Sequence, residues 1–144
     1  GTVIESQADI ERLMASTTQV RLLLDAGHLT YAGGDPVTIA ERHADRITHV
    51  HCKDIRLAVM DNAINRDKSF LDAVLDGVFT VPGDGGIDFA ALFAVLARKG
   101  YGKDTERWLV VEAEQDPSVA DPLTYATLGY QTLSRLARDA GLIN

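Results

Sequence analysis

The sequence is poor in sulfur and has no long hydrophobic run. It contains one cysteine and two methionines in 144 residues. A single cysteine, Cys52, excludes a disulfide bond within the chain and fits a reducing compartment such as the cytoplasm. The apolar runs are short, and the one that starts at Val20 is already interrupted at Arg21. No segment approaches the roughly 20 apolar residues that a membrane-spanning helix needs, so we expect no membrane span.

Basic residues are also scarce. Lysine and arginine number 14 against 21 aspartates and glutamates, which gives a formal net charge of −7. A nucleic-acid surface needs clustered positive charge, so we expect no nucleic-acid partner. The first residues lack the basic and then apolar pattern of a secretory signal. With 46% hydrophobic and 24% charged residues, the composition is that of a soluble globular protein, which we expect to be cytoplasmic.

Apolar periodicity divides the chain into alternating strands and helices. We predict strands over residues 20–25, 47–52 and 108–112, and helices over residues 6–14, 35–46, 87–99 and 121–140. An amphipathic segment is expected around residues 70–75, after an irregular stretch at 53–67. Asp35 followed by Pro36 is a strong helix start, and Gly100 is a strong helix stop.

Strands that alternate with helices of this length predict βαβ units and an α/β fold with a parallel sheet. A closed (β/α)₈ barrel takes eight strands and about 250 residues, so three strands form only a partial barrel. Their open edges favour pairing with another copy, and a homo-oligomer is one expectation. The chain also begins without methionine and runs straight into a helical pattern, which suggests a segment of a larger protein.

Carboxylate and imidazole side chains end each of the three predicted strands. Asp25 ends the first strand. The second strand ends with His49 and His51, and the third with Glu112 and Glu114. Because functional groups in parallel α/β folds gather at the carboxyl ends of strands, these side chains are expected to converge. Mixed nitrogen and oxygen ligands of this kind suit a divalent cation such as Mn²⁺, Co²⁺, Mg²⁺ or Zn²⁺.

Simpler interpretations exist for each residue taken alone. Asp25 could be only a helix cap, and paired glutamates on one strand face are usually solvated. The joint occurrence on three consecutive strands favours the metal site. The glycine-rich segment at residues 83–86 could cradle a phosphate, but it lacks the spacing of a P-loop, and a loop that needs positive φ angles is the preferred interpretation. Cys52 lies on the strand face opposite His51, which predicts a packed core thiol.

The strand ends and the glycine loop together resemble a known family. The segments are Leu-Asp-Ala-Gly-His at 24–28, His-Val-His-Cys-Lys-Asp at 49–54, Val-Pro-Gly-Asp-Gly-Gly-Ile-Asp-Phe at 81–89 and Trp-Leu-Val-Val-Glu-Ala-Glu-Gln-Asp-Pro at 108–117. They resemble strands six to eight of the xylose-isomerase-like TIM barrels, and among these most of all the inosose dehydratases. The resemblance covers residues 1–144, as the C-terminal part of such a barrel.

The resemblance implies Asp25, His51 and Glu112 as metal ligands, with Mn²⁺ or Co²⁺ as the expected ion. The choice between Glu112 and Glu114 is open, since both lie on the same side of the strand; Glu112 is favoured because it directly follows the apolar run. A further ligand and catalytic group of the family comes from its fifth strand, which would precede Gly1.

The resemblance also implies the substrate contacts. His28, Lys53 and Arg56 would bind the substrate, and His28, Lys53 and Glu114 would be catalytic. The implied activity is metal-dependent dehydration of 2-keto-myo-inositol, a small polyhydroxy ketone, to a trihydroxycyclohexane-dione in inositol catabolism. The alternatives are a keto-sugar isomerase or epimerase of the same superfamily, and an inactive barrel fragment.

Overall fold

The computed structural model describes residues 3–143. The helices are α1 (Gln7–Ser16), α2 (Ala26–Tyr31), α3 (Pro36–His43), α4 (Leu57–Asn65), α5 (Phe70–Leu75), α6 (Phe89–Arg98) and α7 (Pro122–Asp139). The strands are β1 (Leu22–Asp25), β2 (Ile47–Cys52), β3 (Asp54–Ile55), β4 (Phe79–Thr80) and β5 (Trp108–Val111). None of the helices described here combines the length and the apolar character that crossing a bilayer requires.

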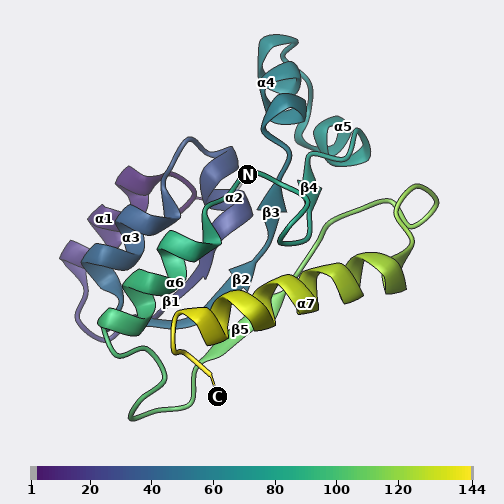
Figure 1. Ribbon diagram of the computed structural model, residues 1–144. Coiled ribbons are helices and arrows are strands. Elements are labelled where there is room, and N and C mark those ends of the chain that lie inside the picture. Colours follow the sequence, from purple (N-terminus) through teal and green to yellow (C-terminus); the bar gives the residue numbers. More distant parts are fainter. Residues whose placement is uncertain (1–2, 144) are drawn as a thin grey trace.

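The centre of the fold is a three-stranded parallel sheet in the order β1-β2-β5 (Figure 1). Its register pairs Asp25 with His51, and His51 with Val110. The prediction of an α/β fold with a parallel sheet, built as part of a TIM barrel, is therefore confirmed. The register aligns the carboxyl ends of the three strands, which brings their last residues to one edge of the sheet.

One face of this sheet is covered by helices. Leu24, Val50 and Cys52 point into a core formed with buried side chains of α1, α3, α6 and α7. The Cys52 thiol is fully buried, and burial raises its pKa, so it is an inert core residue as predicted. The opposite face carries Leu23 and Trp108, which are 46% and 51% exposed. The sheet is thus packed on one side and open on the other.

Residues 53–67 are more regular than the sequence suggested. The expectation of an irregular stretch is wrong, because β3 pairs antiparallel with β4 further along the chain and α4 begins directly after β3. We call residues 54–80 the arm. Its own small core contains Ile55, Ala63, Ala73 and Phe79. Contacts within the arm therefore stabilise helices and strands that the local sequence pattern does not predict.

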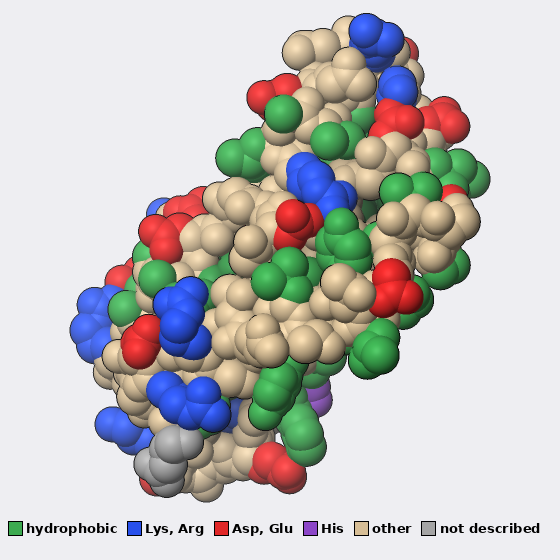
Figure 2. All heavy atoms as spheres, turned by 45° about the vertical axis from the view of Figure 1, so that its right-hand side comes forward, with side chains coloured by type: hydrophobic (Ala, Val, Ile, Leu, Met, Phe, Trp, Pro, Cys, Tyr) green, Lys and Arg blue, Asp and Glu red, His purple; other side chains and the backbone are tan. Residues whose placement is uncertain are grey.

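On the molecular surface, hydrophobic side chains are spread among charged ones (Figure 2).

Tyr101 joins the amino-terminal ends of β2 and β5. Its hydroxyl lies 2.9 Å from Trp108 O and 3.2 Å from Thr48 O, and burial raises its pKa to about 12. We expect Tyr101→Phe to lower the free energy of unfolding by about 1 kcal/mol, the usual value of one buried hydrogen bond. Because the pKa is 10.0 before folding, this stabilisation is complete below pH 10 and is lost as the pH rises through about 12.

Urea unfolding at neutral pH and between pH 10 and about 12 checks this expectation. The variant should lose less stability over the alkaline range than the parent chain. Tyr130→Phe is a matched control, since Tyr130 is 64% exposed on α7 and should show neither effect. Equal losses in both variants would contradict the assignment.

Candidate metal and acid–base site

Three side chains converge at the carboxyl edge of the sheet. Asp25 ends β1, His51 belongs to β2, and Glu112 directly follows β5. Each residue offers one ligand atom, and the three atoms lie within 4.8 Å of one another. Asp25 and His51 lie side by side because they are register partners in the pairing of β1 with β2. Glu112 lies two residues beyond the partner of His51, so its side chain reaches the same face one step further along.

The contacts inside this group are close, and they leave one carboxylate oxygen without a hydrogen bond. His51 Nδ1 lies 3.6 Å from Asp25 Oδ2 and also contacts Glu112 Oε2. That Glu112 oxygen is buried and has no hydrogen-bond partner among the described residues. Buried polar atoms are nearly always satisfied, and an ion is one common partner of an atom that is not. One imidazole and two carboxylates therefore fit a divalent cation, with Glu112 rather than Glu114 in the group.

Asp25 has a second role that the sequence analysis left as an alternative. Its Oδ1 accepts a hydrogen bond of 2.9 Å from the backbone N–H of His28 and caps α2. The sequence analysis missed α2, because Gly27 and the later Gly33-Gly34 pair resemble a turn. The helix cap is observed, whereas the other oxygen, Oδ2, lies near His51 and Lys53, and the role of Asp25 as a metal ligand stays a prediction.

Lys53 lies next to Asp25 and Glu112 as a buried cation. Its side chain is 1% exposed, and Nζ lies 3.4 Å from Asp25, 3.1 Å from Glu112 and 2.7 Å from Glu114. Burial works to lower the pKa of this ammonium, but the hydrogen bond that it donates to Glu114 and the surrounding carboxylates raise the pKa overall, so Lys53 stays charged. Gly27 makes room for it, because a Cβ there would lie 2.8 Å from Lys53 Cγ.

Glu114 and His28 lie next to Lys53 and form one polar group with it. His28 Nε2 lies 2.8 Å from Lys53 Nζ and 2.9 Å from Glu114 Oε2. An ammonium only donates, so an unprotonated Nε2 accepts from Lys53, whereas a protonated Nε2 donates to Glu114. Burial works to raise the pKa of Glu114, but the hydrogen bond and charge of Lys53 and the charge of His28 lower it overall. Glu114 is therefore an ionised carboxylate at neutral pH.

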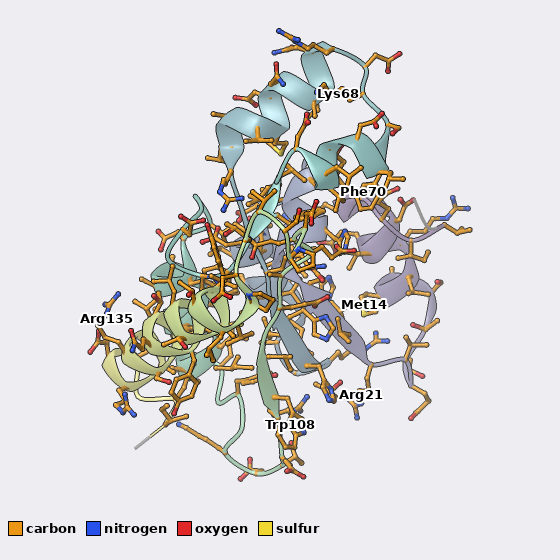
Figure 3. All side chains as sticks on the ribbon, turned by 90° about the vertical axis from the view of Figure 1, so that its right-hand side faces the viewer. Met14, Arg21, Lys68, Phe70, Trp108 and Arg135 are labelled. Carbon is orange, nitrogen blue, oxygen red and sulfur yellow. The ribbon has the colours of Figure 1, made fainter. Side chains whose placement is uncertain are left out.

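Aromatic rings from the arm surround His28. Its imidazole stacks on Phe70 at a centroid distance of 5.8 Å and lies 4.9 Å from Phe79. Tyr31 contacts both phenylalanines, and Lys53 Nζ lies 5.2 Å from the Phe79 ring centre. Figure 3 shows Phe70 and Trp108 at opposite ends of the sheet. These aromatic contacts of His28 could not be predicted from the sequence, since no local motif indicates that α5 folds back over the strand ends.

Arg56 lies within the arm and makes its hydrogen bonds there and in the loop after β4, rather than with Asp25, His51 or Glu112. Its guanidinium donates to Gly77 O at 2.6 Å, to Thr80 Oγ1 at 3.1 Å and to Asp84 Oδ2 at 2.5 Å. Phe79 O accepts a longer bond of 3.4 Å. These contacts show a residue that fixes the loop after β4. Its role as a substrate contact stays a prediction.

The glycine loop is fixed by one buried carboxylate. Asp54 is 1% exposed and accepts backbone N–H bonds from Ile55, Ile87 and Gly83 at 2.8, 2.9 and 3.3 Å. Burial raises its pKa despite these bonds. A positive φ angle explains only some of the glycines in the loop at residues 83–86. Gly83 has a φ of 99°, whereas Gly85 is needed because a Cβ would lie 2.3 Å from the Asp54 carboxylate.

Comparison with known proteins places this geometry in a family. A family model described as xylose isomerase-like TIM barrel matches residues 1–136. The rhizopine catabolism protein MocC of Rhizobium meliloti is 54% identical over 98% of this chain and 42% of its own length. An inosose dehydratase of Clostridium botulinum is 47% identical over 95% of this chain and 45% of its own length. The chain spans less than half the length of these relatives and matches their C-terminal region.

Solved structures show the same fold at low sequence identity. A xylose isomerase domain protein from Alicyclobacillus acidocaldarius superposes with a TM-score of 0.62 at 22% identity, over 93% of this chain and 43% of that one. A protein described as IOLI with a binding zinc atom gives a TM-score of 0.52 at 18% identity, over 96% and 42%. With its parallel sheet and the match over residues 1–136, the chain belongs to the xylose isomerase-like TIM barrel family.

Proposed function

We propose that this site belongs to a metal-dependent lyase that removes water from 2-keto-myo-inositol. Relatives named inosose dehydratase, at 45–48% identity, support the reaction, and the rhizopine catabolism relative supports a role in inositol-related catabolism. The observation that carries the proposal is the juxtaposition of two groups. Asp25, His51 and Glu112 are arranged to hold a cation, and an acid–base group of Lys53, His28 and Glu114 lies directly beside it.

The chemistry divides between these groups. A divalent cation held by Asp25, His51 and Glu112 would supply Lewis-acid polarisation of the ketone and a neighbouring hydroxyl. Ionised Glu114 is suited to remove the proton on the carbon next to the ketone. The charged Lys53 ammonium lies 2.7 Å from Glu114, where it can stabilise negative charge that develops on the substrate oxygens.

His28 is suited to complete the elimination. The electron pair released from the C–H bond forms the carbon–carbon double bond, and the neighbouring C–O bond breaks. A proton from His28 Nε2 would convert the leaving hydroxyl to water. The stacked Phe70 ring holds the imidazole beside Glu114, so donor and base act from the same side of the site.

The test uses a chimera in which these 144 residues replace the matched C-terminal region of the Rhizobium meliloti relative. The metal is removed by chelation and then restored as Mn²⁺, Co²⁺ or Zn²⁺. We expect 2-keto-myo-inositol to lose one molecule of water only in the metal-loaded protein, as followed by mass spectrometry. Glu114→Gln should lower kcat about 100-fold or more while metal binding persists, because a general base contributes roughly that factor.

Other outcomes identify other chemistry. A product of unchanged mass would indicate an isomerase or epimerase and would contradict dehydration. Unchanged activity after chelation would remove the metal from the mechanism. Glu106→Gln is the control for the glutamate substitution, because Glu106 lies before β5, at the other end of that strand.

A further inference from the structure

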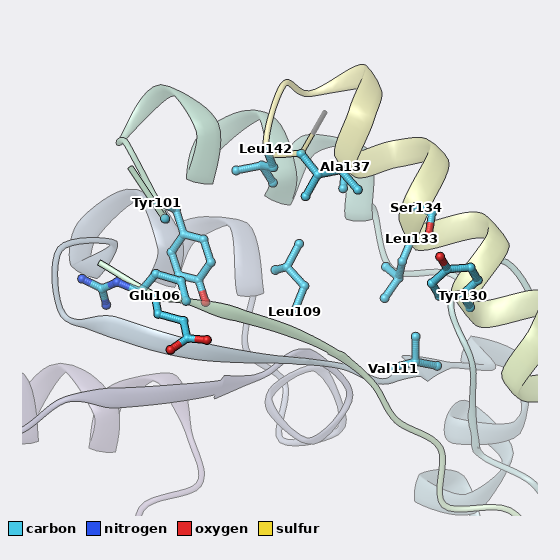
Figure 4. Close-up of a pocket in the computed structure, with 12 residues that line it drawn as sticks. Tyr101, Glu106, Leu109, Val111, Tyr130, Leu133, Ser134, Ala137 and Leu142 are labelled. Carbon is cyan, nitrogen blue, oxygen red and sulfur yellow. The ribbon is translucent and has the colours of Figure 1, made fainter. Parts of the chain in front are cut away.

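The segment that carries the two glutamates of the site lies beyond the regular sheet. Leu109 and Val111 of β5 face Leu133 of α7 across a cavity of about 400 Å³, and β5 pairs with β2 along its length (Figure 4). β5 ends at Val111, and residues 112–116 adopt neither helix nor strand. Sheet pairing and helix packing thus fix β5, whereas the position of Glu114 depends on side-chain contacts.

The residue after Glu114 makes a contact that reaches the arm. Gln115 Nε2 lies 3.3 Å from Thr80 Oγ1 and donates a hydrogen bond to it. Thr80 belongs to β4 and is fully buried, whereas Gln115 is half-buried. Because Gln115 directly follows Glu114 in the chain, a bond that fixes Gln115 also restricts the backbone of Glu114.

The Thr80 hydroxyl has one arrangement that satisfies all of its neighbours. Its oxygen lies 2.7 Å from Asp84 Oδ2, 3.1 Å from Arg56 Nη2 and 3.3 Å from Gln115 Nε2. A carboxylate only accepts and a guanidinium only donates, so the hydroxyl gives its single hydrogen to Asp84 and accepts from Arg56. It has no second hydrogen to give, so Gln115 must present its NH₂ group to Thr80. The contact therefore fixes the orientation of the Gln115 amide.

The surroundings of Thr80 are themselves well fixed. Asp84 belongs to the glycine loop, whose backbone N–H groups donate to the buried carboxylate of Asp54. Phe79, the neighbour of Thr80 in β4, lies 4.9 Å from the ring of His28. β4 thus contacts both the imidazole of the site and the segment that carries the proposed base.

We propose that Thr80 is a positioning residue, which holds Glu114 in place for proton removal through its hydrogen bond with Gln115. This inference rests on the role of Glu114 in the proposed function, and it adds the arm to the parts of the molecule that proton removal requires. A general base must lie within hydrogen-bond reach of the proton that it removes. A displacement of about 1 Å can lower a rate about 100-fold.

The experiment uses the metal-loaded chimera described above. Thr80→Val removes the hydroxyl and nearly keeps the shape of the side chain. It should lower kcat for 2-keto-myo-inositol about tenfold or more and leave KM unchanged, because the bond serves proton removal rather than substrate binding. Thr80→Ser keeps the hydroxyl and should restore most of kcat. Gln115→Met removes the donor and should reproduce the loss, and since Gln115 is half-buried it tests the link even if Thr80→Val does not fold.

A double-mutant cycle identifies the link between the two side chains. Thr80→Val combined with Gln115→Met should lower kcat no further than either substitution alone, since both remove the same hydrogen bond. Titration calorimetry should give the parent metal affinity in each variant, because Glu112 contacts His51 and Lys53 rather than Gln115. Losses of kcat that multiply, or a fall of metal affinity alongside kcat, would contradict the proposal.

Thr17→Val is the matched control for Thr80→Val. Thr17 Oγ1 also accepts from an arginine, at 3.0 Å from Arg46 Nη2, and donates to Leu13 O at 2.8 Å. Thr17 precedes β1 and lies away from the carboxyl edge of the sheet. Loss of its hydroxyl should leave kcat at the parent value.

Amide hydrogen exchange separates this inference from the proposed reaction. Residues 112–116 should exchange faster in Thr80→Val and Gln115→Met than in the parent or in Thr80→Ser, whichever substrate the protein uses. A parent chimera without dehydratase activity would overturn the proposed function, whereas unchanged exchange would overturn the link to Thr80. Faster exchange with unchanged kcat in an active chimera would leave Thr80 a purely structural residue and overturn its positioning role.

Discussion

His51→Ala is expected to lower the affinity of the chain for a divalent cation at least about 100-fold. Replacing a group that only supports a ligand already weakens binding by 10–100-fold, and His51 is itself the central member of the three-residue group. Its Nδ1 lies between Asp25 Oδ2 and Glu112 Oε2, so its loss leaves two carboxylates without the nitrogen that bridges them. Titration calorimetry with Mn²⁺ and with Zn²⁺ measures the change.

The same strand provides the control for this substitution. His49 lies two residues earlier on the same face of β2, and its Nδ1 contacts Thr48 Oγ1 at 3.3 Å. His49→Ala should leave the metal affinity unchanged. If both variants lose affinity equally, imidazoles on this face bind the metal non-specifically, and the assignment of the ligands is wrong.

Lys53→Met is expected to change stability and metal affinity in opposite directions. Without metal, the variant leaves three carboxylates next to one another with no buried cation between them. We expect the free energy of unfolding to fall by about 3 kcal/mol, the lower end for a broken buried ion pair, because the carboxylates remain 15–39% exposed. Methionine keeps the aliphatic volume next to Gly27, so packing contributes little to the loss.

The metal affinity of the same variant should rise. The Lys53 ammonium lies 3.1 to 3.4 Å from two of the ligand carboxylates and repels any cation bound there. Its removal should tighten binding at least about tenfold, since a charge at such a distance contributes a few kcal/mol even at an effective dielectric constant near 20, and about 1.4 kcal/mol is a factor of ten in affinity. Chemical unfolding with a chelator and with saturating metal measures both effects.

Lys68→Met is the control for Lys53→Met. Lys68 pairs with Asp76 on the arm, and both side chains are about a third exposed. An exposed pair contributes less than about 1 kcal/mol, and its loss should not alter metal binding. A parallel fall of stability and metal affinity in Lys53→Met would mean that Lys53 supports the cation site instead of opposing cation binding.

Strand periodicity predicted the site better than it predicted the arm. Residues that end consecutive parallel strands must meet, so order and spacing predicted that Asp25 meets the histidines of the second strand and the glutamates of the third. The family resemblance implied His51 and Glu112 among them. Which glutamate lies close to Asp25 and His51 depends on where β5 ends, and in the structure it is Glu112. Their role as metal ligands remains a prediction.

The arm could not be predicted in the same way. Its order comes from contacts between β3, β4, α4 and α5, whose members are distant in sequence and too short to show a clear period. The burial of Lys53 could not be predicted from the sequence either, since it depends on the absence of a side chain at Gly27. Long-range packing of this kind leaves no local signal.

The helix cap made by Asp25 limits how this residue could hold an ion. One of its oxygens accepts the His28 backbone N–H, so only the other oxygen points toward His51. A cation here would take a single oxygen from Asp25, as chelation by both would release the first turn of α2. Asp25 would thus supply one oxygen beside His51 and Glu112, and its replacement would disturb both the start of α2 and the proposed ion site.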